Sequence, residues 1–227
     1  MKSFIYILLT SLTFLVVGCQ NESEEIRLIN QAERLFDAYP DSVITTLDSI
    51  PLPEEMSPRL IARWCMLYAR AADKIEDEMP YTNQLEIALK YYQKKKMREE
   101  EAEIGLYLGR SYVEDKEYEK AMRTYSDALK VALAIKDYNR AGYICSYMGD
   151  LYEVDLRYIL AAEKYKESGK YFHLANNTTS YVRAFVNEGR SYMSVDSNYL
   201  ALASLKQAEV IMDSLNVENV KTYVYKD

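Results

Sequence analysis

Residues 108–112 read Leu-Gly-Arg-Ser-Tyr, and residues 188–192 repeat them as Glu-Gly-Arg-Ser-Tyr. Midway between the two stretches stand Gly149 and Tyr152, so the glycine and the tyrosine recur every forty residues. Three further columns keep this spacing downstream: Ala121, Ala161 and Ala201; Tyr125, Tyr165 and Leu205; Ala128, Ser168 and Ala208. A repeat of roughly 20 to 50 residues is typical of a solenoid, in which each copy stacks on the next.

The apolar residues within each copy follow the period of an α-helix. Ile104, Leu108 and Tyr112 are spaced by four residues, which places them on one helix face. The downstream columns at 121, 125 and 128 are spaced by four and three residues and indicate a second helix. No proline follows Pro80, so none interrupts these helices. The sequence therefore predicts an all-α fold, an α-solenoid of stacked antiparallel helix pairs.

The motif Leu108-Gly109-x-x-Tyr112, followed by Ala121-x-x-x-Tyr125-x-x-Ala128, resembles the tetratricopeptide repeat (TPR). The resemblance implies a right-handed superhelix in which each copy has a first helix A and a second helix B. It also implies that the glycine lets helix A approach its neighbour, while the aromatic side chain fills the adjoining space. The period of forty exceeds the usual value of about 34, so longer helices are expected. The usual tryptophan and terminal proline are missing, so no specific partner is carried over from the family.

Counting in steps of forty divides most of the chain into four TPR-like repeats, at 62–101, 102–141, 142–181 and 182–221. A short helix pair and a proline-rich linker are expected before them, at 24–61. A tail follows at 222–227. This tail contains Tyr223-Val224-Tyr225, which could begin another helix A. Either the tail folds over the last repeat, or the protein continues beyond residue 227.

The N-terminus carries the pattern of a secretory signal. Lys2 precedes an almost uninterrupted apolar run of fourteen residues at 4–17. A membrane-spanning helix needs about 20 apolar residues, so the shorter run fits the apolar core of a signal peptide. An ordinary cleaved signal and an uncleaved anchor helix are the simpler alternatives.

The end of this segment resembles a bacterial lipoprotein signal, because Val16-Val17-Gly18 places small residues before Cys19. The resemblance implies that residues 1–18 are removed, that Cys19 is lipidated on its sulfur and its amine, and that residues 19–23 form a tether. Gln20, in place of an aspartate, implies by the same resemblance an outer-membrane lipoprotein. The protein would then lie on the periplasmic side or on the cell surface.

The composition argues against several classes of function. The 28 Lys and Arg against 35 Asp and Glu give a net charge of −7, which disfavours nucleic-acid binding. The sequence contains no glycine-rich phosphate loop, no nucleophile elbow and no paired-cysteine zinc spacing. We therefore expect no enzyme activity, no cofactor, no metal and no small-molecule substrate.

The few residues with chemical potential have structural interpretations. His173 is the single histidine and is interpreted as a packing or surface residue. Asp73 and the acidic residues at 76–78 lack the turn glycine of a calcium loop and are interpreted as a solvated turn. Cys65 and Cys145 occupy one repeat column two copies apart, too far for a disulfide. Both are predicted to be buried, free thiols.

Helix A has a second face, away from its glycine and tyrosine packing stripe, and in TPR arrays this face lines a concave groove. Arginine and aromatic side chains are enriched at binding hot spots. This face predicts a groove for a protein or peptide, with tyrosine platforms and arginine forks for carboxylates. A merely solvated inner face is the alternative. The predicted groove residues are Arg70, Tyr107, Arg110, Tyr143, Tyr147, Asp150, Arg183, Asn187 and Arg190.

Together these features predict a lipid-anchored TPR scaffold that binds a protein or peptide partner and catalyses no reaction. Two alternatives remain open. The chain could be the sensory half of a longer regulatory protein that is truncated near residue 227. It could also be an outer-membrane assembly lipoprotein, similar to the TPR subunit of the barrel-assembly machinery.

Overall fold

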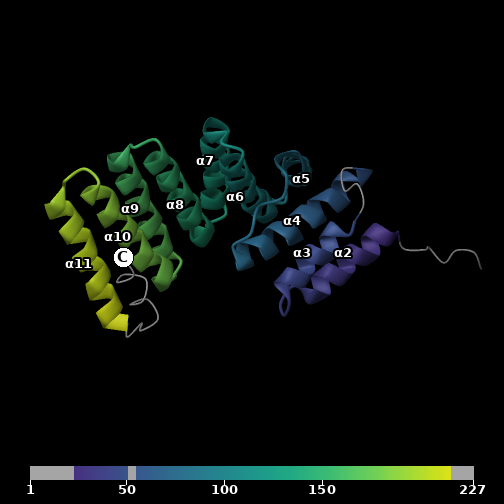
Figure 1. The fold of residues 1–227 in the computed structure, drawn as a ribbon, viewed down its shortest axis with the longest axis horizontal. Helices are drawn as coiled ribbons and strands as arrows, with labels where there is room; N and C mark the ends of the chain where they lie inside the picture. Colours follow the sequence, from purple (N-terminus) through teal and green to yellow (C-terminus); the bar gives the residue numbers. More distant parts are fainter. Residues whose placement is uncertain (1–22, 51–54, 216–227) are drawn as a thin grey trace, which may run out of the picture.

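The computed structural model describes residues 23–50 and 55–215, and within these ranges the chain forms ten helices and no strand. The prediction of an all-α fold is therefore confirmed. The helices follow one another in chain order along an elongated array, with α2 at one end and α11 at the other (Figure 1). The expected signal peptide, Cys19 and the tail at 222–227 lie outside the described residues.

The helices form successive pairs, each joined by a short turn. The pairs are α2 (Glu24–Leu35) with α3 (Pro40–Asp48), α4 (Pro58–Ile75) with α5 (Thr82–Lys95), α6 (Arg98–Glu114) with α7 (Tyr118–Ala134), α8 (Tyr138–Val154) with α9 (Tyr158–Leu174), and α10 (Thr178–Met193) with α11 (Asn198–Leu215). From α4 onward the first helices begin forty residues apart, at 58, 98, 138 and 178. These four are the A helices of the expected repeats, and their partners are the B helices.

The turn after each helix from α4 to α10 contains one residue with a positive φ angle. These residues are spaced by twenty: Glu76, Lys96, Lys116, Lys136, Leu156, Asn176 and Asp196. At Lys116 the backbone N–H donates to Val113 O at 2.9 Å, and the N–H of Glu117 donates to Tyr112 O at 2.8 Å. This pair of bonds is the Schellman motif, which satisfies the last carbonyls of a helix. The spacing shows that helix A and helix B occupy equal halves of each forty-residue copy.

The recurring glycines lie where helix A crosses helix B of the same pair. A Cβ atom on Gly149 would lie 2.7 Å from Cε1 of Tyr165, and one on Gly109 would overlap the ring of Tyr125. Both tyrosine side chains are fully buried. Each ring therefore occupies the space that the absent side chain leaves, as the resemblance to the TPR implied.

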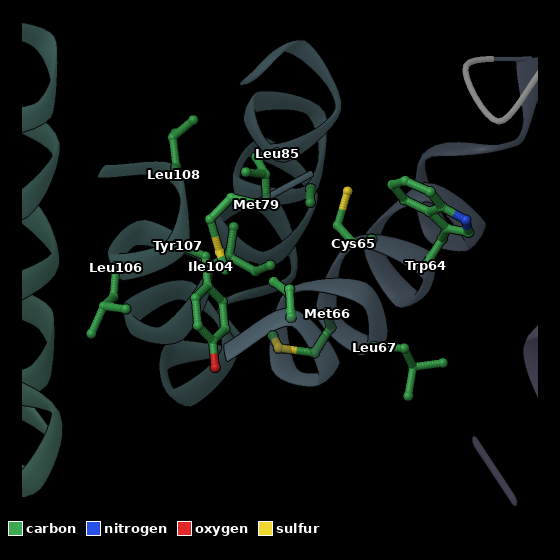
Figure 2. Packing of buried hydrophobic residues seen from close by; sticks show 14 of the residues in the cluster. Trp64, Cys65, Met66, Leu67, Met79, Leu85, Ile104, Leu106, Tyr107 and Leu108 are labelled. Carbon is green, nitrogen blue, oxygen red and sulfur yellow. The ribbon is translucent and has the colours of Figure 1, made fainter. Parts of the chain in front are cut away.

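Buried side chains form a continuous core that extends from α2 to α8. Figure 2 shows part of this core, where side chains of α4, α5 and α6 meet and where Cys65, Leu85 and Ile104 are completely buried. Cys65 and Cys145 are both buried and free, as predicted. Burial raises the pKa of the Cys145 thiol to about 12, so it remains an unreactive thiol at neutral pH.

Gly109→Ala should destabilise the fold by about 1–3 kcal/mol, because the new methyl group overlaps the Tyr125 ring. This loss should appear although alanine is a better helix former than glycine by about 1 kcal/mol. Urea unfolding measures the change in free energy. Gly189→Ala is the matched control in the same column, since its Cβ would meet the flexible Leu205 side chain at 3.0 Å. A loss at Gly189 as large as that at Gly109 would contradict the assigned packing.

Candidate functional site

A cleft of about 750 Å³ runs along the A helices α6, α8 and α10 and reaches the C-terminal end of α4. We call it the helix-A cleft. Eight of the nine predicted groove residues line it: Tyr107, Arg110, Tyr143, Tyr147, Asp150, Arg183, Asn187 and Arg190. Arg70 lies beside the cleft and contacts it through Glu103, which is in the lining. The structure thus brings the predicted residues together, and their role in binding stays a prediction.

Glu103 is the centre of an ion-pair cluster in the N-terminal half of the cleft. Arg70 donates to both carboxylate oxygens of Glu103, from Nε at 2.6 Å and from Nη2 at 2.7 Å. Arg140 adds a third contact from Nη2 at 3.1 Å. Burial alone would raise the pKa of Glu103, but the hydrogen bonds and positive charge of Arg70, together with Arg140, outweigh burial and lower this pKa. Glu103 is therefore ionised and fully engaged.

Arg110 is also engaged by its own chain. It forms an ion pair with Asp73 at the end of α4, and its guanidinium lies 5.5 Å from the ring centroid of Tyr147. The Tyr147 ring in turn stacks on Tyr125 at 6.0 Å. Asp73 was interpreted from the sequence as part of a solvated turn, but in the structure it lies on α4 and lines the cleft. The arginine forks at Arg70 and Arg110 are already occupied by internal carboxylates.

The C-terminal half of the cleft differs in charge. Arg190 is exposed on α10 and forms no ion pair with any side chain of residues 23–50 or 55–215. The half-buried Asn187 lies one turn before it on the same helix. This half therefore presents an exposed guanidinium that forms no direct ion pair within the described ranges, although its charge acts on Asp150.

Asp150 is the one exception in a repeat column of arginines. Its column otherwise holds arginine, at Arg70, Arg110 and Arg190. The hydroxyl of Tyr165 donates to Asp150 Oδ1 at 2.6 Å, whereas Tyr125, one copy earlier, is paired in sequence with Arg110. Arg110 has no acceptor to offer, and the buried Tyr125 hydroxyl has no hydrogen-bond partner among the described residues.

The Asp150 side chain is exposed toward the cleft. Desolvation by the protein around the cleft raises the pKa of Asp150, and the hydrogen bond from Tyr165 and the charges of Arg190 and Arg183 offset this rise only in part. A carboxylate that is held among arginines and a tyrosine is well placed to orient a polar ligand group in the C-terminal half of the cleft.

The three predicted tyrosine platforms are unequal. Tyr143 is 36% exposed, its hydroxyl lies 3.3 Å from Ser180 Oγ, and its ring meets Phe172 edge-on at 4.9 Å. Tyr147 is half-buried, and Tyr107 is only 7% exposed. Tyr143 is therefore the ring that offers most surface to a ligand.

Several lining residues were not predicted from the sequence, among them Asp73, Glu103, Asp137, Arg140 and Ser180. Glu103 stands one helical turn before Tyr107, so extending the predicted face by a turn would have found it. Asp73 stands three residues after Arg70 on α4, so the same extension of the predicted face would have found it.

The single histidine of the chain does not line the cleft. His173 is exposed near the end of α9, and its ring lies 5.0 Å from that of Tyr181. No group of three or more His, Cys, Asp or Glu residues in the described ranges could hold a metal ion. None of the helices described is both long and apolar enough to cross a membrane.

No protein-family model matches the sequence, and no curated protein matches it. Solved structures are similar to it in fold. Apo RapI covers 88% of this chain and is covered over 74% of its own length, with a TM-score of 0.70 and 12% identity. BtubC from P. vanneervenii covers 83% of this chain and is covered over 74%, with a TM-score of 0.57 and 18% identity.

The TPR-like repeats of a kinesin light chain from Podospora anserina are a third similar structure, with a TM-score of 0.57 and 12% identity. They cover 83% of this chain and are covered over 95%. At these identities the similarity concerns the fold. The protein is a TPR-like α-solenoid, and the expected fold class is confirmed.

Tyr165→Phe should lower the free energy of unfolding by about 1 kcal/mol, because it removes a hydrogen bond to a carboxylate that remains partly hydrated. Tyr125→Phe should be neutral or slightly stabilising, because its hydroxyl is buried without a partner. Paired urea titrations measure both changes. Equal losses in the two variants would show that the two hydroxyls do not differ as described.

Glu103→Gln should destabilise the protein at pH 7 by about 1–2 kcal/mol, because it weakens the bonds to Arg70 and Arg140. The lowered pKa of Glu103 means that its stabilising effect is complete above the ordinary value of 4.5 and is lost as pH falls through the folded-state value. The difference between wild type and variant should therefore shrink on acidification. Thermal unfolding between pH 7 and pH 3 measures it, and a difference independent of pH would refute the assignment.

Proposed function

We propose that the protein is a lipid-anchored scaffold that holds a protein or peptide partner along its helix-A cleft. One observation carries the proposal: side chains from three A helices, which are forty residues apart in sequence, converge on a single cleft of about 750 Å³. Helical repeats of this architecture present an extended inner surface suited to macromolecular partners. The cleft contains no assembled nucleophile and base, which favours binding over catalysis.

The charges in the cleft suggest how a partner is held. The cluster around Glu103 and the Arg110–Asp73 pair are neutralised internally, so they give the N-terminal half a fixed shape. Arg190 and Asn187 supply hydrogen-bond donors that are open to a ligand, and Tyr143 adds an aromatic surface near Ser180 in the same cleft. An extended segment with a carboxylate near Arg190 is the partner that this arrangement fits best.

The proposed anchor rests on the sequence alone. The apolar run at 4–17 and the residues up to Cys19 support lipidation, and Gln20 supports an outer-membrane location by resemblance. A fatty anchor adds about 0.8 kcal/mol of membrane affinity for each buried CH₂ group, so several acyl chains hold firmly. The tether at 19–23 would then carry the solenoid close to the membrane surface.

Crosslinking and purification from native membranes test the proposal. The double variant Arg190→Ala, Asn187→Ala should recover a specific partner about tenfold less well than wild type, as expected for hot-spot side chains. Arg123→Ala is the control, because this exposed arginine lies on the B helix α7. In the same preparation the Cys19→Ser variant should be lost from the membrane fraction and appear in the soluble fraction. If the double variant recovers every partner as well as wild type does, the cleft is not the binding site. If the Cys19→Ser variant stays in the membrane fraction, Cys19 is not the anchor.

A further inference from the structure

Several large apolar side chains are exposed together at one edge of the array. Because the A helices run in one direction, the turns from helix A to helix B share this edge, and Figure 1 shows the α8–α9 and α10–α11 turns there. Helix α10 packs against both α9 and α11, so these two turns are neighbours. We call the exposed group the edge patch: Val154, Leu156, Ile159, Met193, Tyr199 and Leu200.

The fold itself does not require apolar residues at the α8–α9 turn. The α6–α7 turn, one copy earlier, has the same helix boundaries shifted by forty residues, yet it carries charged residues at three equivalent positions. The side chains are exposed in both copies, so the apolar ones gain little from burial within their own chain. A contact outside the chain is therefore needed to explain them. The equivalent pairs are Glu114 and Val154, Lys116 and Leu156, and Glu119 and Ile159.

Leu156 shows this most clearly. It is 71% exposed and has a φ angle of 56°, in the left-handed region that a leucine side chain disfavours. The other six turn residues with a positive φ are glutamate, lysine, asparagine or aspartate. On the next B helix, Tyr199 stands in the repeat column of Ile159 and is 83% exposed. Large apolar side chains that gather on a surface are typical of an interface.

The charges at the edge patch indicate what covers it. Arg157 lies in the α8–α9 turn and Asp196 in the α10–α11 turn. Asp196 forms no ion pair within the described part of the chain. Arg157 reaches Asp155 at 3.8 Å, but both side chains are more than half exposed, so this pair contributes little. The patch therefore carries a weakly engaged cation on one turn, an unpaired anion on the other, and apolar side chains on both.

We propose that the edge patch is the contact surface between two copies of this chain. A surface with a cation on one side and an anion on the other is self-complementary about a two-fold axis, because each charge meets its opposite on the second copy. In this dimer the α8–α9 turn of one copy faces the α10–α11 turn of the other. Arg157 pairs with Asp196 of the partner subunit, the reciprocal pair forms as well, and the apolar side chains cover one another.

A second copy fits the patch better than a lipid surface does. Asp155 and Asp196 are both exposed at the patch, and a bilayer would bring them against the phosphates of the headgroups. None of the six patch residues lines the helix-A cleft, so the dimer contact and the partner site use different side chains. Each dimer then carries two clefts.

Cysteine crosslinking of the full chain in native membranes tests the dimer. Arg157→Cys combined with Asp196→Cys should give a crosslinked dimer on oxidation, because the two positions face each other across the two-fold axis. Lys136→Cys combined with Asn176→Cys is the matched control, since these exposed residues lie in neighbouring turns at the opposite edge. Adding the triple change Val154→Glu, Leu156→Lys, Ile159→Glu should lower the crosslinked fraction at least about tenfold. The copy before it carries these three residues, so the fold accepts them.

Equal crosslinking in the two cysteine pairs, or none in the edge-patch pair, would overturn the proposal. No crosslink, together with quenching by brominated lipid of a fluorophore attached to the Arg157→Cys variant, would identify a bilayer as the partner instead.

A charge exchange tests the predicted ion pair. Sedimentation equilibrium of the full chain in density-matched detergent measures the dimer dissociation constant. Arg157→Asp and Asp196→Arg should each raise this constant about tenfold, because each places like charges together across the axis. The two changes in one chain restore opposite charges and should return the constant to within about twofold of wild type. A combined variant that dimerises no better than the single variants would contradict the pairing.

Discussion

One steric constraint supports the whole structure: at Gly109 and Gly149 the absence of a side chain leaves room for a tyrosine ring between helix A and helix B. The contact sets the separation of α6 from α7 and of α8 from α9, and at Gly189 a leucine side chain takes the place of the ring. Because the helix turns recur every twenty residues from Glu76 to Asp196, successive pairs have similar lengths and stack to bury a core that no pair could bury alone. The A helices then lie in register, and their free faces line one continuous cleft.

Residues at the same position of successive copies make different polar contacts. Asp150 accepts a hydrogen bond from the tyrosine of its own copy, whereas Arg110, one copy earlier, pairs with Asp73 and leaves Tyr125 without an acceptor. A solenoid tolerates such local costs because its stability is approximately a sum over neighbouring copies. The side chains that face the cleft can therefore diverge while the packing contact beneath them is kept.

The two cavities differ in the charge of the side chains that line them. In the helix-A cleft Glu103 and Arg110 are paired within the chain, whereas Arg190 forms no direct ion pair among the described residues and acts on Asp150 only through its charge. A second cavity, of about 680 Å³, lies beside Trp64, and its lining contains three carboxylates, of Asp48, Glu78 and Asp115, and no lysine or arginine. The two places therefore differ in charge because different helices contribute their polar side chains.

The sequence by itself determined the period, the helix pairs, the glycine column, the buried cysteines and eight lining residues of the cleft, because all of these depend on spacing along single helices. Only the tertiary structure decided that Arg110 is neutralised by Asp73, that Tyr107 is almost fully buried, and that a second cavity exists beside Trp64. The physical reason is that helical periodicity specifies which residues share a face. The contacts, the burial and the electrostatic partners of that face come from other helices, and the packing of those helices sets them.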